Sequence, residues 1–171
     1  LSAGDAKTGW ELFDEIQPIG LTSKPSIEVA FKRVDTREEF LSYVRTISDD
    51  FRATKRLPLL HIETHGFVDG IGPASGQEIL WPDLMQELIP LNRLTQLRLI
   101  VVLAACEGLW GLQMAQPVER AAFLALLGPN ERISAAKLAA ACQTFYRSIF
   151  KDRNGDAAFK AMNDVVDPTK L

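Results

Sequence analysis

Nearly continuous apolar runs alternate with amphipathic segments along the chain, and the two patterns predict different elements. Residues 97–105 (LRLIVVLAA) are apolar at almost every position, as expected of a strand whose two faces are both covered in a parallel sheet. Shorter runs rich in apolar and β-branched residues predict three further strands, over residues 27–34, 57–64 and 121–127.

The helical segments carry apolar residues at intervals of three and four positions. The clearest pattern spans residues 36–54, and Thr36 and Glu39 at its start have the spacing of a capping box. The residues expected on its buried face are Phe40, Val44, Ile47 and Phe51. Further helices are predicted over residues 10–16, onward from Asp83, and over residues 135–150 and 157–165.

Strands that alternate with helices indicate an α/β fold with a mostly parallel central sheet and helices on both of its faces. The 171 residues fit a single domain. Residues 1–25 contain several glycines and prolines, which predicts a loop-rich N-terminal segment. In folds of this class, reactive groups lie beyond the carboxyl ends of the strands. Residues that directly follow a strand are therefore the first candidates for chemistry.

Two reactive side chains stand at such positions. His65 follows the run 57–64, and Cys106 follows the run 97–105. If the two strands are neighbours, an imidazole and a thiol meet in one cleft. A thiol with a pKa of about 8.5 is mostly protonated at neutral pH, so it needs a base to become a nucleophile. The same imidazole can then protonate the leaving amine. His65 and Cys106 are therefore the predicted catalytic pair.

Small residues around both side chains leave room for a substrate backbone. Ala105 and Gly108 flank the cysteine, and Gly66 follows the histidine. Backbone amides aimed at a developing negative charge stabilise the tetrahedral intermediate of acyl transfer. The amides of Gly66 and Cys106 are the predicted oxyanion hole.

The motif AACEG, centred on Cys106, and the motif THG, centred on His65, resemble the catalytic motifs of the caspase–hemoglobinase clan. Caspases place a histidine about 50 residues before their Gln-Ala-Cys-x-Gly motif, and here the two residues are 41 positions apart. The likeness is closest to the CHAT group of caspase-like domains and covers roughly residues 27–162. It implies a three-layer caspase-like sandwich and a cysteine endopeptidase that forms a thioester acyl-enzyme, regulated as part of a larger protein.

The resemblance also implies which residues recognise the substrate. Many members of the clan use carboxylates to read arginine or lysine. CHAT-type relatives often place an acid after the last core strand, where this chain has Glu131. Asp69, four residues after His65, is the second predicted substrate-binding residue.

The chain departs from the family pattern at several places. Thr64 stands before the histidine, where many relatives have glycine or serine, and Glu107 follows the cysteine. A carboxylate beside a thiol disfavours the thiolate if it points into the cleft. Relatives also have a strand before the first helix, for which residues 1–5 are too short. Either that strand lies outside this chain or the fold is arranged differently.

Each candidate also has a plainer interpretation. Cys106 could be an inert buried thiol, His65 a loop histidine bonded to backbone, and Glu131 and Asp69 solvated loop acids. Two alternative functions follow: a caspase-like binding or scaffold module without turnover, or another thiol hydrolase or acyltransferase on an α/β sheet. Cys142, on the apolar face of a predicted helix, is expected to be a core residue.

A metal site is a weaker interpretation of the histidines. On a strand, His61, Glu63 and His65 would share one face. No additional ligand accompanies them, so we predict no metal. The cysteine–histidine chemistry also needs no organic cofactor.

Composition narrows the partners. The formal net charge is −3, and lysines and arginines are scattered among acids, which argues against a nucleic-acid module. No apolar run reaches the roughly 18 residues of a membrane span. Two cysteines in unlike contexts indicate separate thiols in a reducing, cytoplasmic compartment. The expected partners are a peptide or protein substrate and a regulatory domain or protein.

Overall fold

The computed structural model describes residues 8–72, 76–105, 108–115 and 120–166. The chain divides into two compact units. Unit 1 combines Leu1–Arg33 with Ile133–Leu171, and unit 2 consists of Val34–Arg132. The expectation that residues 1–171 act as a single domain stays a prediction.

Unit 2 is built around a parallel sheet in the order β1-β5-β6. β1 (Leu59–Glu63) and β6 (Ala125–Leu127) both pair in parallel with the central strand β5 (Ile100–Ala104). These strands are the inner parts of three of the four predicted runs. The predicted α/β class with a parallel sheet is therefore confirmed.

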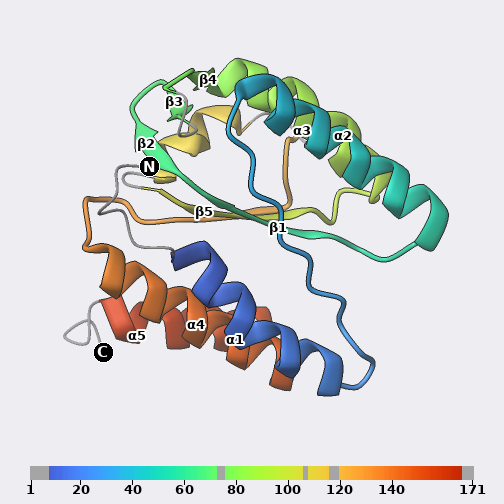
Figure 1. The fold of residues 1–171 in the computed structure, drawn as a ribbon, viewed down its shortest axis with the longest axis vertical. Helices are drawn as coiled ribbons and strands as arrows, with labels where there is room; N and C mark the ends of the chain where they lie inside the picture. Colours follow the sequence, from blue (N-terminus) through green and yellow to red (C-terminus); the bar gives the residue numbers. More distant parts are fainter. Residues whose placement is uncertain (1–7, 73–75, 106–107, 116–119, 167–171) are drawn as a thin grey trace. The chain divides into compact units, whose positions relative to one another are not determined.

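Helices α2 (Arg37–Thr54) and α3 (Trp81–Leu94) lie side by side and pack with the sheet into one apolar core (Figure 1). Apolar residues at the spacing predicted for both segments lie in the core or pack against it. Val44 and Phe51 of α2 are buried, and Phe40 and Ile47 pack against the core cluster that contains Val44. The core residues with no exposed surface include Leu84, Leu88, Leu91, Leu99, Val101 and Leu103.

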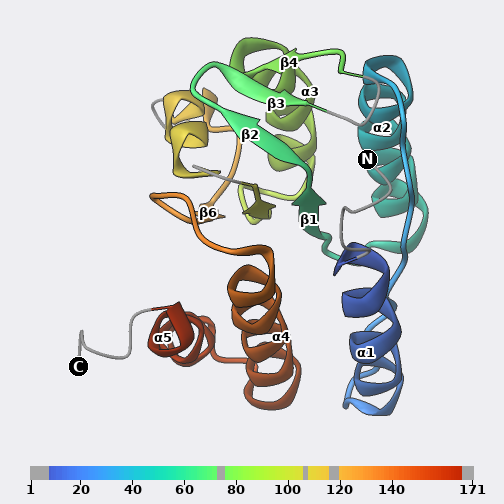
Figure 2. The ribbon, with the colours of Figure 1, turned by 60° about the vertical axis from the view of Figure 1, so that its left-hand side comes forward.

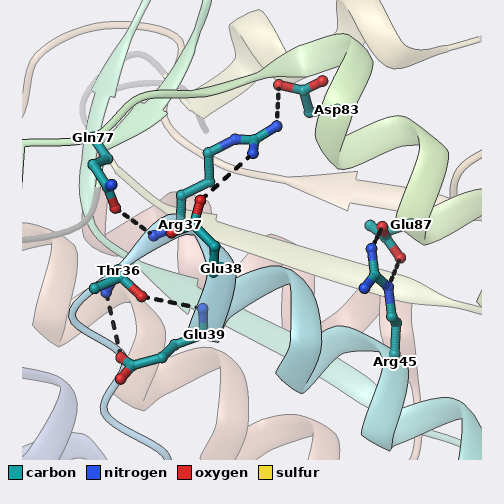
Figure 3. A network of polar contacts seen from close by, with 8 residues as sticks. All are labelled: Thr36, Arg37, Glu38, Glu39, Arg45, Gln77, Asp83 and Glu87. Atoms are coloured by element: carbon teal, nitrogen blue, oxygen red, sulfur yellow. Dashed lines mark hydrogen bonds and ion pairs between the residues drawn. The ribbon is translucent and has the colours of Figure 1, made fainter.

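Helix α2 begins as the sequence predicts. The Thr36 hydroxyl accepts a hydrogen bond from the Glu39 amide at 3.2 Å, and the Glu39 carboxylate accepts one from the Thr36 amide at 3.4 Å. Figure 3 shows this reciprocal capping box. It satisfies backbone donors of the first turn that have no partner inside the helix.

Polar side chains join α2 to α3 along their exposed sides (Figure 3). Arg37 Nη2 lies 3.0 Å from Asp83 Oδ2, and the Arg37 amide donates to Gln77 Oε1 at 3.0 Å. Further along the two helices, the Arg45 guanidinium of α2 donates two hydrogen bonds to the Glu87 carboxylate of α3. These bonds raise the pKa of Arg45. The polar contacts thus fix the pairing of two helices whose apolar sides share the core.

Two of the predicted strands start later than expected, because the chain turns before it enters the sheet. Gln96 and Leu97 have φ angles of 58° and 60°, in the left-handed region. The buried Asn92 binds the two segments that lead into β5 and β6. Its Nδ2 donates to the Ala121 carbonyl at 2.9 Å, and its Oδ1 accepts from the Leu99 amide at 3.1 Å. These two segments are therefore tied to α3, and they are also tied to each other because the Leu124 amide donates to the Leu99 carbonyl at 2.7 Å.

A second sheet stands beyond the end of β1. β2 (His65–Phe67), β3 (Gly70–Gly72) and β4 (Ile79–Leu80) pair antiparallel in the order β2-β3-β4, and β2 follows β1 directly (Figure 2). The sequence predicts a loop here with a hairpin into residues 77–80, so the strand pairing is more extensive than expected. After β5, the 3-10 helix η1 (Gly108–Met114) begins.

Unit 1 consists of α1 (Thr8–Thr22), α4 (Ala135–Asp152) and α5 (Gly155–Val166), and α4 packs against both of the other helices (Figure 2). All three predicted helices are confirmed, each with longer bounds. Ser134 caps α4, since its hydroxyl accepts from the Lys137 amide at 3.3 Å. In the described part of the chain, no helix combines the length and apolar character that crossing a membrane requires.

The predicted strand over residues 27–34 is wrong: the structure assigns it to neither sheet. The segment turns back on α1 instead. The Ile27 amide donates to the Gly20 carbonyl at 2.9 Å, and the Phe31 ring packs on Trp10 and Phe13. Strand propensity depends on packing against a paired neighbour, and here the β-prone side chains contact a helix.

Candidate active site

The two strands that precede the candidate catalytic residues are neighbours. β1 and β5 pair in parallel, and their last partners are Glu63 and Ala104. One residue beyond, the Thr64 amide donates to the Ala104 carbonyl at 3.4 Å. His65 and Cys106 each follow two positions after these paired ends. The first condition for a shared cleft, adjacent strand ends, is therefore met.

His65 is exposed and is the first residue of β2, where it pairs with Gly72 of β3. The prediction that His65-Gly66 simply ends a strand is therefore incomplete: the pair ends the path along β1 and starts a hairpin. The Thr64 hydroxyl donates to the Gly72 carbonyl at the base of this hairpin. Gly66, a predicted oxyanion-hole residue, lies half-buried opposite Ile71.

The tip of the hairpin is held by elements from far along the chain. The Val68 carbonyl accepts two hydrogen bonds, from Trp81 Nε1 at 2.7 Å and from Gln113 Nε2 at 2.8 Å. The Trp81 amide donates to the Asp69 carbonyl at 3.0 Å. The hairpin that carries His65 is thus bound to both α3 and η1, the helix that follows Cys106 in sequence.

Cys106 and Glu107 lie outside the described residues, but the residues on either side of them are described. Ala105 is buried, and its carbonyl accepts from the Gly108 amide at 3.0 Å. A Cβ at position 108 would stand 2.7 Å from the Leu103 carbonyl oxygen. The glycine of the AACEG motif is therefore required by the close return of the chain onto the end of β5.

The loop after β6 joins the same region. The Leu109 amide donates to the Pro129 carbonyl at 3.0 Å, and a Cβ at Gly128 would lie 3.0 Å from the Leu103 carbonyl oxygen. Glu131, two residues after Pro129, is exposed. This predicted substrate-binding residue therefore belongs to a loop that contacts the start of η1.

Asp69, the other predicted substrate-binding residue, is exposed in the turn between β2 and β3. That turn is the one bonded to Trp81 and Gln113. Both predicted carboxylates therefore stand on segments that touch η1, one from the hairpin and one from the loop after β6.

The histidines do not share one regular strand. His61 and Glu63 belong to β1, and His61 Nε2 lies 3.8 Å from Glu63 Oε2, whereas His65 belongs to β2. Among the residues that the structure describes, no three His, Cys, Asp or Glu side chains are grouped as metal ligands. Cys142 is buried in α4, as predicted for a core residue.

The contacts of Trp81 and Gln113 are the part of the site that the sequence did not reveal. Trp81 is buried, as expected for a packing residue, but its indole also binds the Val68 carbonyl. Gln113 reaches that carbonyl from 45 positions away. Trp81 and Gln113 also line a pocket of about 220 Å³, together with Pro82, Met85 and Met114. No local sequence pattern signals contacts of this span.

Comparisons with protein-family models, with curated proteins and with solved structures gave no match to this chain. The caspase-like resemblance therefore depends on the motifs around His65 and Cys106, and the function has to be argued from the site itself.

Proposed function

We propose that the chain is a cysteine endopeptidase in which Cys106 is the nucleophile and His65 the general base and acid. The observation that carries the proposal is the parallel pairing of β1 and β5, with Glu63 opposite Ala104. Neighbouring strands lie about 4.8 Å apart. Two residues that follow paired strand ends by the same number of positions therefore leave the sheet within reach of each other.

The chemistry follows from the two groups. His65 takes the thiol proton as the Cys106 sulfur attacks the carbonyl carbon of the scissile peptide bond. The carbonyl oxygen becomes an oxyanion, to which the amides of Gly66 and Cys106 donate. The C–N bond then breaks, His65 protonates the leaving amine, and a thioester remains on Cys106. Water, deprotonated by His65, hydrolyses the thioester and regenerates the thiol. The reaction needs no metal or organic cofactor.

We further propose that the substrate is read at a basic residue. Glu131 and Asp69 are both exposed, so a cationic side chain can reach either carboxylate. The turn that carries Asp69 contacts Gln113 near the end of η1, and the loop that carries Glu131 contacts Leu109 near its start. Arginine and lysine are therefore the preferred residues before the cleaved bond.

The arrangement proposed for the whole chain is the caspase-like three-layer sandwich of the CHAT type, with helices on both faces of the parallel sheet. In such a fold the peptidase would work as one part of a larger, regulated protein in the cytoplasm. A regulatory domain or partner protein would then control access to the cysteine.

The test is cleavage of a peptide library, read by mass spectrometry, with the wild-type chain and with Cys106→Ala. We expect cuts after arginine or lysine that disappear in the variant. Cys142→Ala is the matched control and should cut like wild type, because Cys142 is buried in α4.

Three results would overturn the proposal. Cuts that persist in Cys106→Ala would show that the thiol is not the nucleophile. If the folded wild-type chain makes no cuts and Cys106 alkylates no faster than Cys142, the domain is a binding or scaffold module. Rapid alkylation without cleavage of any peptide, together with turnover of a thioester or ester, would indicate a different thiol hydrolase or acyltransferase.

A further inference from the structure

Thr64 stands where the chain passes from one sheet to the other. Its backbone amide donates to the Ala104 carbonyl at the end of β5, at 3.4 Å. Its hydroxyl donates to the Gly72 carbonyl at the end of β3. One half-buried residue thus binds the parallel sheet through its backbone and the antiparallel sheet through its side chain.

These two hydrogen bonds determine the position of the His65 backbone. His65 is joined to Thr64 by a planar peptide bond and pairs with Gly72, the residue that accepts the Thr64 hydroxyl. His65 is itself exposed, so burial constrains it little. The Thr64 hydroxyl therefore holds the base of the hairpin, where His65 pairs with Gly72.

We infer that Thr64 is a positioning residue whose hydroxyl holds His65, the proposed general base, at the base of the hairpin. The inference rests on the proposed peptidase function and assigns a role to a position where the chain departs from the family pattern. A serine there would supply the same hydroxyl, whereas a glycine would not.

The expected effect follows from the geometry of proton transfer. A general base must lie within hydrogen-bond reach of the proton it takes, about 2.6–3.2 Å between heavy atoms. A displacement of about 1 Å can cost on the order of a hundredfold in rate. Without the hydroxyl, the hairpin base keeps its backbone pairing but loses one restraint. We therefore expect kcat to fall by about tenfold, the equivalent of one hydrogen bond of about 1.4 kcal/mol.

The experiment compares Thr64→Val with Thr64→Ser. Valine keeps the shape and the β-branch but removes the hydroxyl, and serine keeps the hydroxyl but removes the methyl group. We expect about tenfold lower kcat with nearly unchanged KM for valine, and kcat within about threefold of wild type for serine. Equal kcat for valine and wild type, or an equal loss for serine and valine, would overturn the inference. If Thr64→Val does not fold, Thr64→Ala takes its place against serine.

A second measurement separates this inference from the proposed function. Amide hydrogen exchange reports opening of β2 and β3 whether or not the chain cleaves peptides. We expect faster exchange at the amides of β2 in Thr64→Val than in Thr64→Ser, with the exchange of β5 unchanged. Unchanged exchange at β2 would show that the hydroxyl does not hold the hairpin. A wild-type chain that neither cleaves peptides nor alkylates rapidly would overturn the proposed function instead, and with it the catalytic role of this hydrogen bond.

Discussion

The parallel sheet and the antiparallel sheet of unit 2 adjoin at Thr64 and share one apolar core, yet the β2–β3 hairpin that carries His65 depends more on side-chain hydrogen bonds. In the parallel sheet, Val101 and Leu103 have no exposed surface and belong to one apolar core. In the hairpin of the antiparallel sheet, Val68 is 47% exposed and His65 is exposed. Ile71 of β3 and Ile79 of β4 are buried in the same core, and the ends of the hairpin are held by side chains that donate to the backbone carbonyls of Gly72 and Val68.

We therefore expect apolar burial to determine the stability of unit 2, and the side-chain hydrogen bonds of the hairpin to determine the geometry of the proposed site. Burial of apolar surface is strong and without direction, whereas a hydrogen bond is modest in energy but sets a distance and an angle. A change in the parallel sheet should therefore destabilise unit 2 as a whole. Loss of a side-chain hydrogen bond to the hairpin should move His65 while most of the folding free energy is retained.

The largest effect is expected from Leu103→Ala, in β5. The side chain is fully buried, and its removal leaves a cavity next to Gly111. We expect the free energy of unfolding to fall by about 2–5 kcal/mol, measured by urea denaturation. The matched control is Leu124→Ala, since Leu124 is 62% exposed and should change stability by less than about 0.5 kcal/mol. Similar losses at both positions would contradict a core centred on β5.

The next effect is expected from Gly70→Ala, in the hairpin. A Cβ at Gly70 would lie 2.2 Å from the Ile79 carbonyl oxygen, so β3 and β4 must separate. We expect a loss of about 1–3 kcal/mol, with faster amide exchange in β2 and β3 and slower alkylation of Cys106. Gly72→Ala is the control, because its Cβ would meet only the Phe67 ring at 3.6 Å. Equal exchange in the two variants would show that close strand packing does not shape the hairpin.

The sequence predicts the elements whose signal is local. Thr36 and Glu39 are three residues apart, and the structure confirms their capping box. The apolar run before Cys106 becomes the central strand β5. The placement of His65 directly after β1 follows from the same kind of pattern. In each case the residues that determine the structure lie within a few positions of each other.

What the sequence did not predict depends on distant contacts. The β2 and β3 strands hold three glycines among six residues and show no apolar alternation, so their pairing could not be read from propensity. Their tip is fixed by Gln113, 45 positions away. Conversely, residues 27–34 have strong strand propensity, yet they pack on α1 because of Gly20 and the Trp10 ring.

A smaller effect is expected at the edge of the core, from Thr36→Ala. The substitution removes the hydroxyl that accepts from the Glu39 amide, while the apolar face of α2 stays intact. We expect a loss of about 1 kcal/mol in the free energy of unfolding, and a much smaller loss for Thr36→Ser. Peptide cleavage should be unchanged, since α2 is outside the proposed site. A loss as large as that of Leu103→Ala would mean that capping, rather than burial, dominates the stability of α2.

The smallest effect is expected from the Arg45–Glu87 pair, and its dependence on salt is more informative than its size. In the Arg45–Glu87 pair the arginine side chain is 65% exposed and the glutamate 18%, whereas both members of the Arg37–Asp83 pair are about one-third exposed, at 35% and 34%. The guanidinium of Arg45 is therefore the most hydrated of the four groups. Exposed ion pairs contribute little because water and salt screen them. Double-mutant cycles to alanine should give a coupling for Arg45–Glu87 that disappears at about 1 M salt, where the screening length is about 3 Å. The coupling of Arg37–Asp83 should persist in part, because fewer ions reach a half-buried pair. If both couplings vanish equally, the two pairs are equally hydrated, and the contacts between α2 and α3 depend on the apolar core alone.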